Sequence, residues 1–331
     1  MRYLKENEAT VLFTSQWSEN TPDDDLQFLA DGVVELAQDD VGRSLEVPKL
    51  RGSDRQSGSH ALTISEGGIE VFRVLVPGDH DAAFATETIP SGVDNLDSLL
   101  NGGIERGTVT VVSGPTGVGK TTTGSLFMTE AAARGERSVI YMFEESTATF
   151  RHRSEAVGIP VDEMVEEGTL AVKEIEPLDL SPEEFASMVR EEVEERDTNV
   201  VMIDGIKGYT LSIQGDEDEL VRKLHALGRY LKNMGVTVIF LDEVGTVSGE
   251  FRPTESGISY LADNILFLRY AEMGAEIGKV AGVLKKRVGT FERTLRPFGI
   301  DTGGVTVGEP LSDVSGLLTG SPSFGDADGS K

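Results

Sequence analysis

The sequence predicts an α/β protein built on a mostly parallel central sheet, with helices on both faces and an antiparallel extension toward the C-terminus. Three observations support this fold class. Apolar, β-branched segments alternate with amphipathic helical segments between residues 108 and 241. A glycine-rich turn joins the first apolar segment to a long helical one. After residue 264, short strand segments follow one another without helices between them, as in an antiparallel sheet.

The strands can be placed in order from the same pattern. Buried strands of the parallel part are expected at residues 108–113, 138–143, 199–203 and 236–241. The antiparallel strands are expected at residues 264–270, 280–285, 292–298 and 305–307.

The helices fall between these strands. A helix over residues 120–134 is expected to end at Gly135, because glycine readily adopts the left-handed conformation that closes helices. Residues 182–196 place apolar side chains on one face, which predicts an amphipathic helix with an acidic outer face. A further helix follows from the apolar stripe Leu220, Val221, Leu224, Leu227 and Leu231.

The composition is that of an acidic protein without cysteine. Its 331 residues include 30 Lys and Arg against 57 Asp and Glu, a net charge of −27. DNA and anionic lipid are polyanions that such a chain repels, so nucleic acid is not an expected partner. The absence of cysteine in this sequence excludes disulfides, thiolate metal sites and thiol catalysis.

The location expected from the sequence is the cytoplasm. No run of about 18 apolar residues predicts a membrane span. Residues 1–16 do not combine a basic segment with an apolar stretch and a cleavage site, so no secretion signal is expected. The acidic residues are spread along the chain, which suits a cytosol of molar salt as in haloarchaea. An ordinary acidic bacterial protein is the alternative.

A phosphate-binding loop is the clearest chemical motif. Residues 114–121 read GPTGVGKT and match G-x-x-x-x-G-K-[ST] in full, between an expected strand and an expected helix. Backbone N–H groups of such a loop and the helix N-terminus bind phosphate oxygens. Lys120 is expected to reach the β- and γ-phosphates, and the Thr121 hydroxyl to bind Mg²⁺. The other expected nucleotide contacts are Gly114, Pro115, Thr116, Gly117, Val118, Gly119 and Thr122.

Acidic residues follow two of the expected strands. Asp204 comes directly after strand 199–203, where α/β sheets bind ligands, and is the expected second support for Mg²⁺. Glu144 and Glu145 follow strand 138–143, where a carboxylate can orient and deprotonate water or a hydroxyl for attack on the γ-phosphate. A solvated acidic pair is the alternative, and the residues alone leave both open.

An internal repeat relates residues 1–77 to the C-terminal part of the chain. Residues 2–13 resemble residues 229–240 at an offset of 227, and residues 49–71 match residues 285–307 at an offset of 236. Residues 1–77 are therefore expected to form the second half of a unit that is whole at 86–310. The nucleotide-binding half of the first unit would precede Met1, so Met1 is either internal to a longer gene product or the start of a natural truncation.

Two segments lie outside the repeat. Residues 78–85 are expected to form a linker. Residues 311–331 are rich in Gly, Ser and Asp and are expected to be a disordered tail.

In an ordered set of segments the chain resembles the KaiC family of RecA-type ATPases. The segments are residues 89–94, 99–103, 114–121, 143–146, 203–204 and 285–287, and the half repeat adds 49–53. The resemblance implies a RecA-like P-loop NTPase fold. It also implies ATP and Mg²⁺ as cofactors and a homo-oligomeric, hexameric ring with ATP at subunit interfaces. A regulatory or signalling ATPase with an unidentified protein partner follows from it.

The resemblance also assigns roles to residues. Glu144 becomes the general base, with Glu145 beside it. Lys285 and Arg287, with Lys286 between them, become the segment that contacts a neighbouring subunit's ATP. A basic pair on a solvated edge strand is the alternative for these residues.

Two further positions depart from the family pattern. Ser259-Tyr260 stands where the cyanobacterial circadian-clock protein for which the family is named has a Ser-Thr phosphate acceptor pair. The resemblance therefore makes Ser259 a candidate acceptor for Ser/Thr autokinase activity, with a packing or capping hydroxyl as the alternative. Val157 stands where the family has a tryptophan that stacks on adenine, which implies looser base selectivity.

Two other functions compete with this reading. The first is a DNA-binding recombination ATPase of the RecA or RadA type. The expected DNA-facing loops, residues 205–219 and 242–259, hold few basic and many acidic residues, which counts against it. The second is a fragment that binds nucleotide without turnover.

Overall fold

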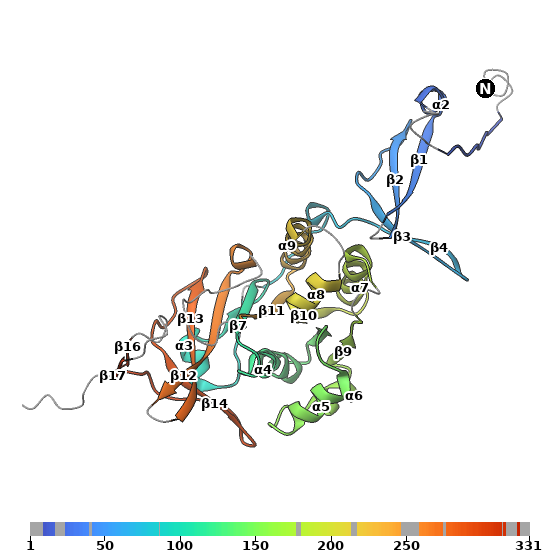
Figure 1. Cartoon of the computed structure of the whole chain (residues 1–331). Coiled ribbons are helices and arrows are strands. Elements are labelled where there is room, and N and C mark those ends of the chain that lie inside the picture. Colours follow the sequence, from blue (N-terminus) through green and yellow to red (C-terminus); the bar gives the residue numbers. More distant parts are fainter. Residues whose placement is uncertain are drawn as a thin grey trace, which may run out of the picture. The chain divides into compact units, whose positions relative to one another are not determined.

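The computed structural model describes residues 9–16, 24–39, 42–85, 87–176, 180–212, 217–245, 258–273, 276–312, 314–315 and 323–324. The chain divides into an N-terminal unit, Met1–Val74, and a C-terminal unit, Leu75–Lys331 (Figure 1). None of the helices in the described ranges combines the length and the apolar character that a bilayer span requires.

The N-terminal unit is a four-stranded antiparallel sheet in the order β1-β2-β3-β4. A short helix, α2 (Asp24–Leu29), precedes it in the part of the chain that the structure describes. The strands are β1 (Gly32–Gln38), β2 (Arg43–Leu50), β3 (His60–Ser65) and β4 (Gly68–Phe72).

The C-terminal unit is built on a nine-stranded sheet in the order β15-β14-β13-β12-β7-β11-β10-β8-β9. Strands β12, β7, β11, β10, β8 and β9 run parallel, and β13, β14 and β15 extend the sheet antiparallel. The strands are β7 (Val109–Gly114), β8 (Arg137–Met142), β9 (Leu170–Glu174), β10 (Thr198–Asp204), β11 (Thr237–Glu243), β12 (Asn264–Met273), β13 (Glu276–Lys286), β14 (Arg296–Asp301) and β15 (Gly304–Val307). The α/β prediction is confirmed.

Helices cover both faces of this sheet. Phe127 and Met128 of α4 belong to one apolar core, and Phe185 of α7 and Leu227 of α9 belong to a second one. The helices are α3 (Asp94–Leu99), α4 (Lys120–Ala133), α5 (Thr147–Glu155), α6 (Val161–Glu166), α7 (Pro182–Glu194), α8 (Ile206–Ser212) and α9 (Glu217–Asn233). Short elements complete the described ranges: η1 (Pro77–Asp79), β5 (Thr88–Ile89), β6 (Ile104–Glu105), η2 (Ile258–Tyr260), β16 (Val314–Ser315) and β17 (Ser323–Phe324).

Two expectations for the C-terminal strands are wrong in detail. The strand predicted at 292–298 begins only at Arg296, because Glu292 turns its carboxylate back to the Arg296 guanidinium at 2.8 Å. The strand predicted at 264–270 is expected to be antiparallel, but β12 pairs in parallel with β7, so that Asn264 lies opposite Thr110. Only β13 and the strands beyond it are antiparallel.

The internal repeat extends to the strand pairing. Leu62 pairs with Val71 between β3 and β4, and their counterparts at an offset of 236, Phe298 and Val307, pair between β14 and β15. Residues 29–31 match residues 261–263 at an offset of 232, and at that offset Leu268 is the counterpart of Leu36. Leu36 pairs with Leu45 as Leu268 pairs with Ala281, the counterpart of Leu45 at an offset of 236. The sheet of the N-terminal unit therefore has the same register as strands β12 to β15.

The segment predicted as a linker packs on helix α9. The Ala82 N–H donates to the Asn233 carbonyl at 2.9 Å, and the Asn233 side-chain amide donates to the Pro77 carbonyl at 2.8 Å. The Phe84 ring lies so close to Gly235 that a Cβ there would come within 2.5 Å of it.

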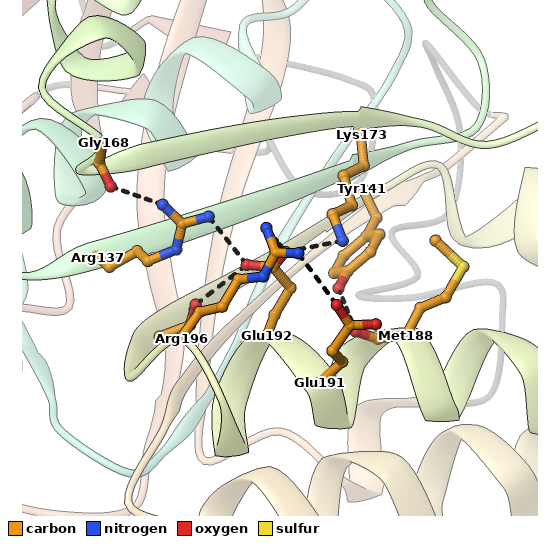
Figure 2. A network of polar contacts seen from close by, with 9 residues as sticks. Arg137, Tyr141, Gly168, Lys173, Met188, Glu191, Glu192 and Arg196 are labelled. Carbon is orange, nitrogen blue, oxygen red and sulfur yellow. Dashed lines mark hydrogen bonds and ion pairs between the residues drawn. The ribbon is translucent and has the colours of Figure 1, made fainter.

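Helix α7 departs from the expected acidic outer face at Glu192, whose side chain is 0% exposed. Its carboxylate pairs with Lys173 at 2.8 Å, Arg137 at 3.1 Å and Arg196 at 3.5 Å (Figure 2). Burial alone would raise the pKa of Glu192, but the hydrogen bonds from Lys173 and Arg137 outweigh it and hold this pKa below its ordinary value. Glu192 therefore joins the end of α7 to strands β8 and β9 as a buried anion.

We expect Glu192→Ala to destabilise the fold by about 3 kcal/mol, because it leaves cationic side chains around an emptied, buried site. Urea unfolding at neutral pH measures this change. The loss of unfolding free energy should be smaller in acid. A carboxylate with a lowered pKa stops stabilising the folded state as the pH falls through that pKa. Glu191→Ala is the matched control on the same helix turn, because its pair with Arg196 is half exposed and worth less than about 1 kcal/mol. Equal losses in the two variants would contradict the buried-anion role.

Candidate active site

The phosphate loop lies between β7 and α4, as the motif predicts. Gly117 has a φ of 73° and Gly119, the N-cap of α4, a φ of 117°, so both adopt the left-handed region that favours glycine. A Cβ on Gly119 would approach Ile300 to 2.4 Å. The loop is therefore held in its turn by conformation and by packing against β14.

Lys120 begins α4 and folds back over the loop. Its Nζ donates to the carbonyl oxygens of Gly114 at 2.9 Å and Pro115 at 3.1 Å. Burial lowers the pKa of Lys120, while the carboxylates of Glu243, Asp204, Glu144 and Asp242 oppose that shift. The ammonium is thus surrounded by carboxylates at the mouth of the loop.

Thr121 and Asp204, the predicted Mg²⁺ ligands, are in contact. The Thr121 hydroxyl donates to the Asp204 carboxylate at 2.7 Å. Burial raises the pKa of Asp204 to about 6, the Thr121 hydrogen bond opposes this, and the charge of Glu144 adds to it. Both are hard oxygen donors, and Mg²⁺ is typically held by one or two protein oxygens together with phosphate oxygens and water. These residues therefore fit the ion.

Glu144 and Glu145 follow β8, whose Met142 pairs with Asp204 of β10. Glu144 stands over the backbone after Asp204, because a Cβ on Gly205 would lie 3.0 Å from the Glu144 Cγ. Glu145 points elsewhere and accepts from Arg153 at 2.6 and 3.1 Å. Arg153 also reaches the Thr122 hydroxyl at 3.4 Å. The two adjacent acids thus have different surroundings, and Glu144 is the one beside Asp204.

The basic segment lies at the opposite end of the sheet from the chain's own phosphate loop. Lys286 pairs with Asn264, which pairs with Thr110 near the start of β7, whereas the loop follows the end of β7. Lys285 donates to the Ser259 carbonyl at 3.1 Å, and Arg287 pairs with the buried Asp263 at 3.1 Å. The structure therefore does not bring Lys285 or Arg287 to Lys120 within one chain.

Lys286 has different surroundings from its two neighbours. Its side chain is 1% exposed and pairs with Glu105 at 2.8 Å. Its ammonium also donates to the Gly103 carbonyl at 2.9 Å and to the Leu100 carbonyl. The contacts of Lys286 thus lie in the interior beside α3.

Three residues near the loop are not predicted from the sequence. The Tyr270 hydroxyl donates to the Thr116 carbonyl at 3.3 Å, and Lys279 Nζ donates to the Gly117 carbonyl at 3.2 Å. They come from β12 and β13, far along the chain, and no local motif marks them. Glu243, whose backbone pairs with Gly114 at the tip of β11, had a usable signal, because it is the second of two acids that follow the expected strand at 236–241.

The remaining candidates lie partly outside the described residues. Val157 follows α5 and packs partly buried against the core that contains α4. Ser259 lies in η2, and its carbonyl accepts from Lys285. Residues 213–216 and 246–257, parts of the expected DNA-facing loops, lie outside the described ranges.

Comparison with known proteins gives one consistent relationship. A family model described as "ATPase: KaiC" matches residues 1–75 and 89–312. The circadian clock oscillator protein KaiC of Picosynechococcus sp. is 28% identical over 305 residues, covering 89% of this chain and 58% of that protein. The circadian clock protein KaiC3 of Synechocystis sp. is 29% identical over 304 residues, covering 90% and 59%. The chain thus spans less than two thirds of the length of these relatives.

We expect Asp204→Asn to stabilise the metal-free protein at pH 8 by roughly 2 to 3 kcal/mol and to have little effect at pH 4. The raised pKa of Asp204 means that the folded state loses stability as the pH rises through about 6, and asparagine removes that loss. Urea unfolding in EDTA at pH 4, 6 and 8 measures it. Asp162→Asn, on an exposed pair with Arg151, is the control and should change stability by less than about 1 kcal/mol. If the free energy of unfolding of Asp204→Asn differed from that of wild type by the same amount at all three pH values, the burial of an ionised Asp204 would be refuted.

Proposed function

The chain belongs to the KaiC family of ATPases, and from that membership we propose that it binds ATP with Mg²⁺ and hydrolyses it as a subunit of a ring oligomer. The observation that supports this most strongly is the arrangement at the strand tips. Lys120, the Thr121–Asp204 pair and Glu144 lie together at the carboxyl ends of β7, β10 and β8. Ligands of open α/β sheets bind at this edge.

Each side chain has a distinct task in this proposal. Lys120 exchanges its loop carbonyls for phosphate oxygens, and Thr121 and Asp204 would hold Mg²⁺, which neutralises charge on the β- and γ-phosphates. Glu144 accepts the proton of the attacking water, because it is the exposed acid beside Asp204. Glu145 is engaged by Arg153 and positions the start of α5.

The placement of the basic segment supports the proposed ring. Along β12, the pairing sites of Lys286 and Lys279 are six residues apart, or about 20 Å. Lys279 sits on the chain's own loop, so Lys285 and Arg287 are too distant to serve the same nucleotide. We assign them to the ATP of an adjoining subunit, where a cation stabilises the charge of the transition state.

Autokinase activity is a further part of the proposal, with Ser259 as the acceptor. Lys285 contacts the Ser259 carbonyl, so a Lys285 that reaches a neighbour's γ-phosphate brings the Ser259 hydroxyl close to it. The output of the ATPase is proposed to be regulatory, through a protein partner. Residues 1–77 are proposed to be the second half of a first domain, and residues 86–310 the complete one, since the two share strand register.

We expect Glu144→Gln to lower kcat for ATP hydrolysis by about 100-fold or more while nucleotide affinity changes little, because a general base acts in the chemical step. Steady-state ATPase assays in molar KCl, with fluorescent-nucleotide titrations, measure both quantities. Glu145→Gln is the matched control and should keep most of the activity, because Glu145 is paired with Arg153. Equal rates for wild type and Glu144→Gln would refute the assignment.

Mixing two inactive variants tests the ring. Lys120→Ala lacks nucleotide binding and Arg287→Ala lacks the donated cation, so each alone should be inactive. In randomly mixed oligomers about a quarter of the sites combine an intact loop with an intact neighbouring cation, and ATPase activity should recover in that proportion. Mixtures of Lys120→Ala with Glu144→Gln are the control and should not recover, because both residues belong to one loop side of the site. Absence of recovery in the first mixture, with oligomers verified by light scattering, would place Arg287 outside the site.

A further inference from the structure

The basic segment at the end of β13 is held by a buried carboxylate, that of Asp263. The Asp263 side chain is 3% exposed, whereas the Arg287 side chain with which it pairs at 3.1 Å is 57% exposed. The Arg287 backbone N–H also donates to the Asp263 carbonyl at 2.9 Å. An exposed arginine is thus attached, by its backbone and by its side chain, to a residue of the interior.

The two oxygen atoms of this carboxylate have separate partners. Oδ2 accepts from the Val109 N–H at 3.0 Å and from the Lys232 ammonium at 2.6 Å. Oδ1 pairs with the Arg287 guanidinium. A charge is retained in a protein interior only when it is paired and hydrogen-bonded. Strand β7 and helix α9 therefore supply the contacts that keep the Asp263 charge buried, and Oδ1 is directed at Arg287.

Lys285 adds a further positive charge beside this carboxylate. Burial lowers the pKa of Lys285, and the charge of Arg287 lowers it further. The charge of Asp263 opposes this shift, and that of Lys232 adds to it. Like charges at such short range repel, and an exposed arginine has many side-chain conformations in which it can move away. The charge of Asp263 offsets this repulsion and favours the conformations in which Arg287 stays beside it.

Asp263 is also tied to the strand that leads to the chain's own phosphate loop. Its backbone N–H donates to the Val109 carbonyl at 2.8 Å, while the Val109 N–H donates to its side chain. Val109 is the first residue of β7, and Gly114, where the loop motif begins, is the last. Every residue of this strand is buried. Arg287 is therefore anchored to the interior of the sheet, although its own side chain is exposed.

We propose that Asp263 is a positioning residue for the cation that each subunit donates to its neighbour's ATP. The inference rests on the proposed function, in which Arg287 stabilises the transition state in the adjoining subunit. A cation that is already oriented needs no rearrangement when charge develops on the phosphates, and a small displacement of such a group slows the chemical step strongly. Asp263 acts through Arg287 and touches no nucleotide, so its loss should lower kcat and leave nucleotide affinity nearly unchanged.

Asp263→Asn tests this role in the full chain, because the amide oxygen can still accept from the Val109 N–H while the charge is lost. We expect kcat for ATP hydrolysis to fall by about 30-fold or more, and the Kd of a fluorescent ATP analogue to change by less than about threefold. Lys232→Gln is the matched control, because it removes another cation from the same carboxylate and leaves Arg287 paired. Its kcat should stay within about threefold of wild type. An Asp263→Asn kcat as high as that of the control overturns the proposal.

Mixed oligomers distinguish positioning from a merely structural role. Asp263→Asn subunits have an intact loop and a misplaced cation, and Lys120→Ala subunits have the reverse. In equal mixtures about a quarter of the sites combine an intact loop with a well-placed cation, and ATPase activity should recover in that proportion. A structural defect that spreads along β7 disables the loop of the Asp263→Asn subunit itself, so the mixture stays inactive and the proposal is overturned.

A double variant keeps the test decisive if Asp263→Asn alone does not assemble, because that substitution leaves the Lys232 charge without its partner. Asp263→Asn combined with Lys232→Gln removes both charges, should form oligomers in light scattering, and should show the same loss of kcat. Wild-type kcat in the double variant, or its failure to assemble, overturns the positioning role.

The mixtures also separate this inference from the proposed function. Recovery with Arg287→Ala but not with Asp263→Asn overturns the role of Asp263 and leaves the proposed ring intact. Absence of recovery in both mixtures contradicts the proposed ring, and with it the positioning of a donated cation.

Discussion

The hydrogen bond of 2.7 Å between Thr121 and Asp204 joins the two halves of the candidate site. One partner opens the helix after the phosphate loop, and the other closes a strand separated from β7 by β11. The contact requires a buried carboxylate, whose pKa of about 6 records the cost of placing it there. A cation beside this carboxylate lowers that cost, which supports the proposed Mg²⁺ site and explains why the charge of Lys120 lies nearby. The geometry of Glu144 depends on the same strand tip.

The parts of the site that depend on local physics are predictable from the sequence. The loop from Gly114 to Thr121 needs its glycines for backbone conformation, and Asp204 follows a run of buried residues, so both are visible without tertiary contacts. The burial of Lys286 and Glu192 cannot be predicted in this way, because the partner of each charge lies far along the chain. Glu105 pairs with Lys286, and Lys173 pairs with Glu192. A basic or acidic residue is taken as solvated until its partner is known.

In the proposed ring, the β12–β13 hairpin serves two nucleotides, one at each of its ends. Antiparallel pairing puts Lys279 opposite Tyr270 at the loop end of the sheet and Lys286 opposite Asn264 at the other end. A hairpin of this length therefore supports the chain's own loop with one end and presents Lys285 and Arg287 with the other. If β13 ran parallel to β12, Lys286 would lie at the loop end of the sheet and Lys279 at the other end. The direction of β12, which its parallel pairing with β7 fixes, therefore decides which of these residues reaches the loop.

The N-terminal unit shows which contacts of the basic segment depend on the repeated strands and which depend on a phosphate loop. Lys49 donates to the Gln27 carbonyl at 2.9 Å, and Arg51 pairs with Asp31 at 3.2 Å. Their counterparts repeat both contacts, Lys285 with the Ser259 carbonyl and Arg287 with Asp263. Residues 1–74 contain no phosphate-loop motif, so the contacts of Lys49 and Arg51 depend on the β-sheet half alone. In both units, therefore, the sheet half holds these cations by contacts of its own, and such preorganisation is what the proposed stabilisation of a developing phosphate charge requires.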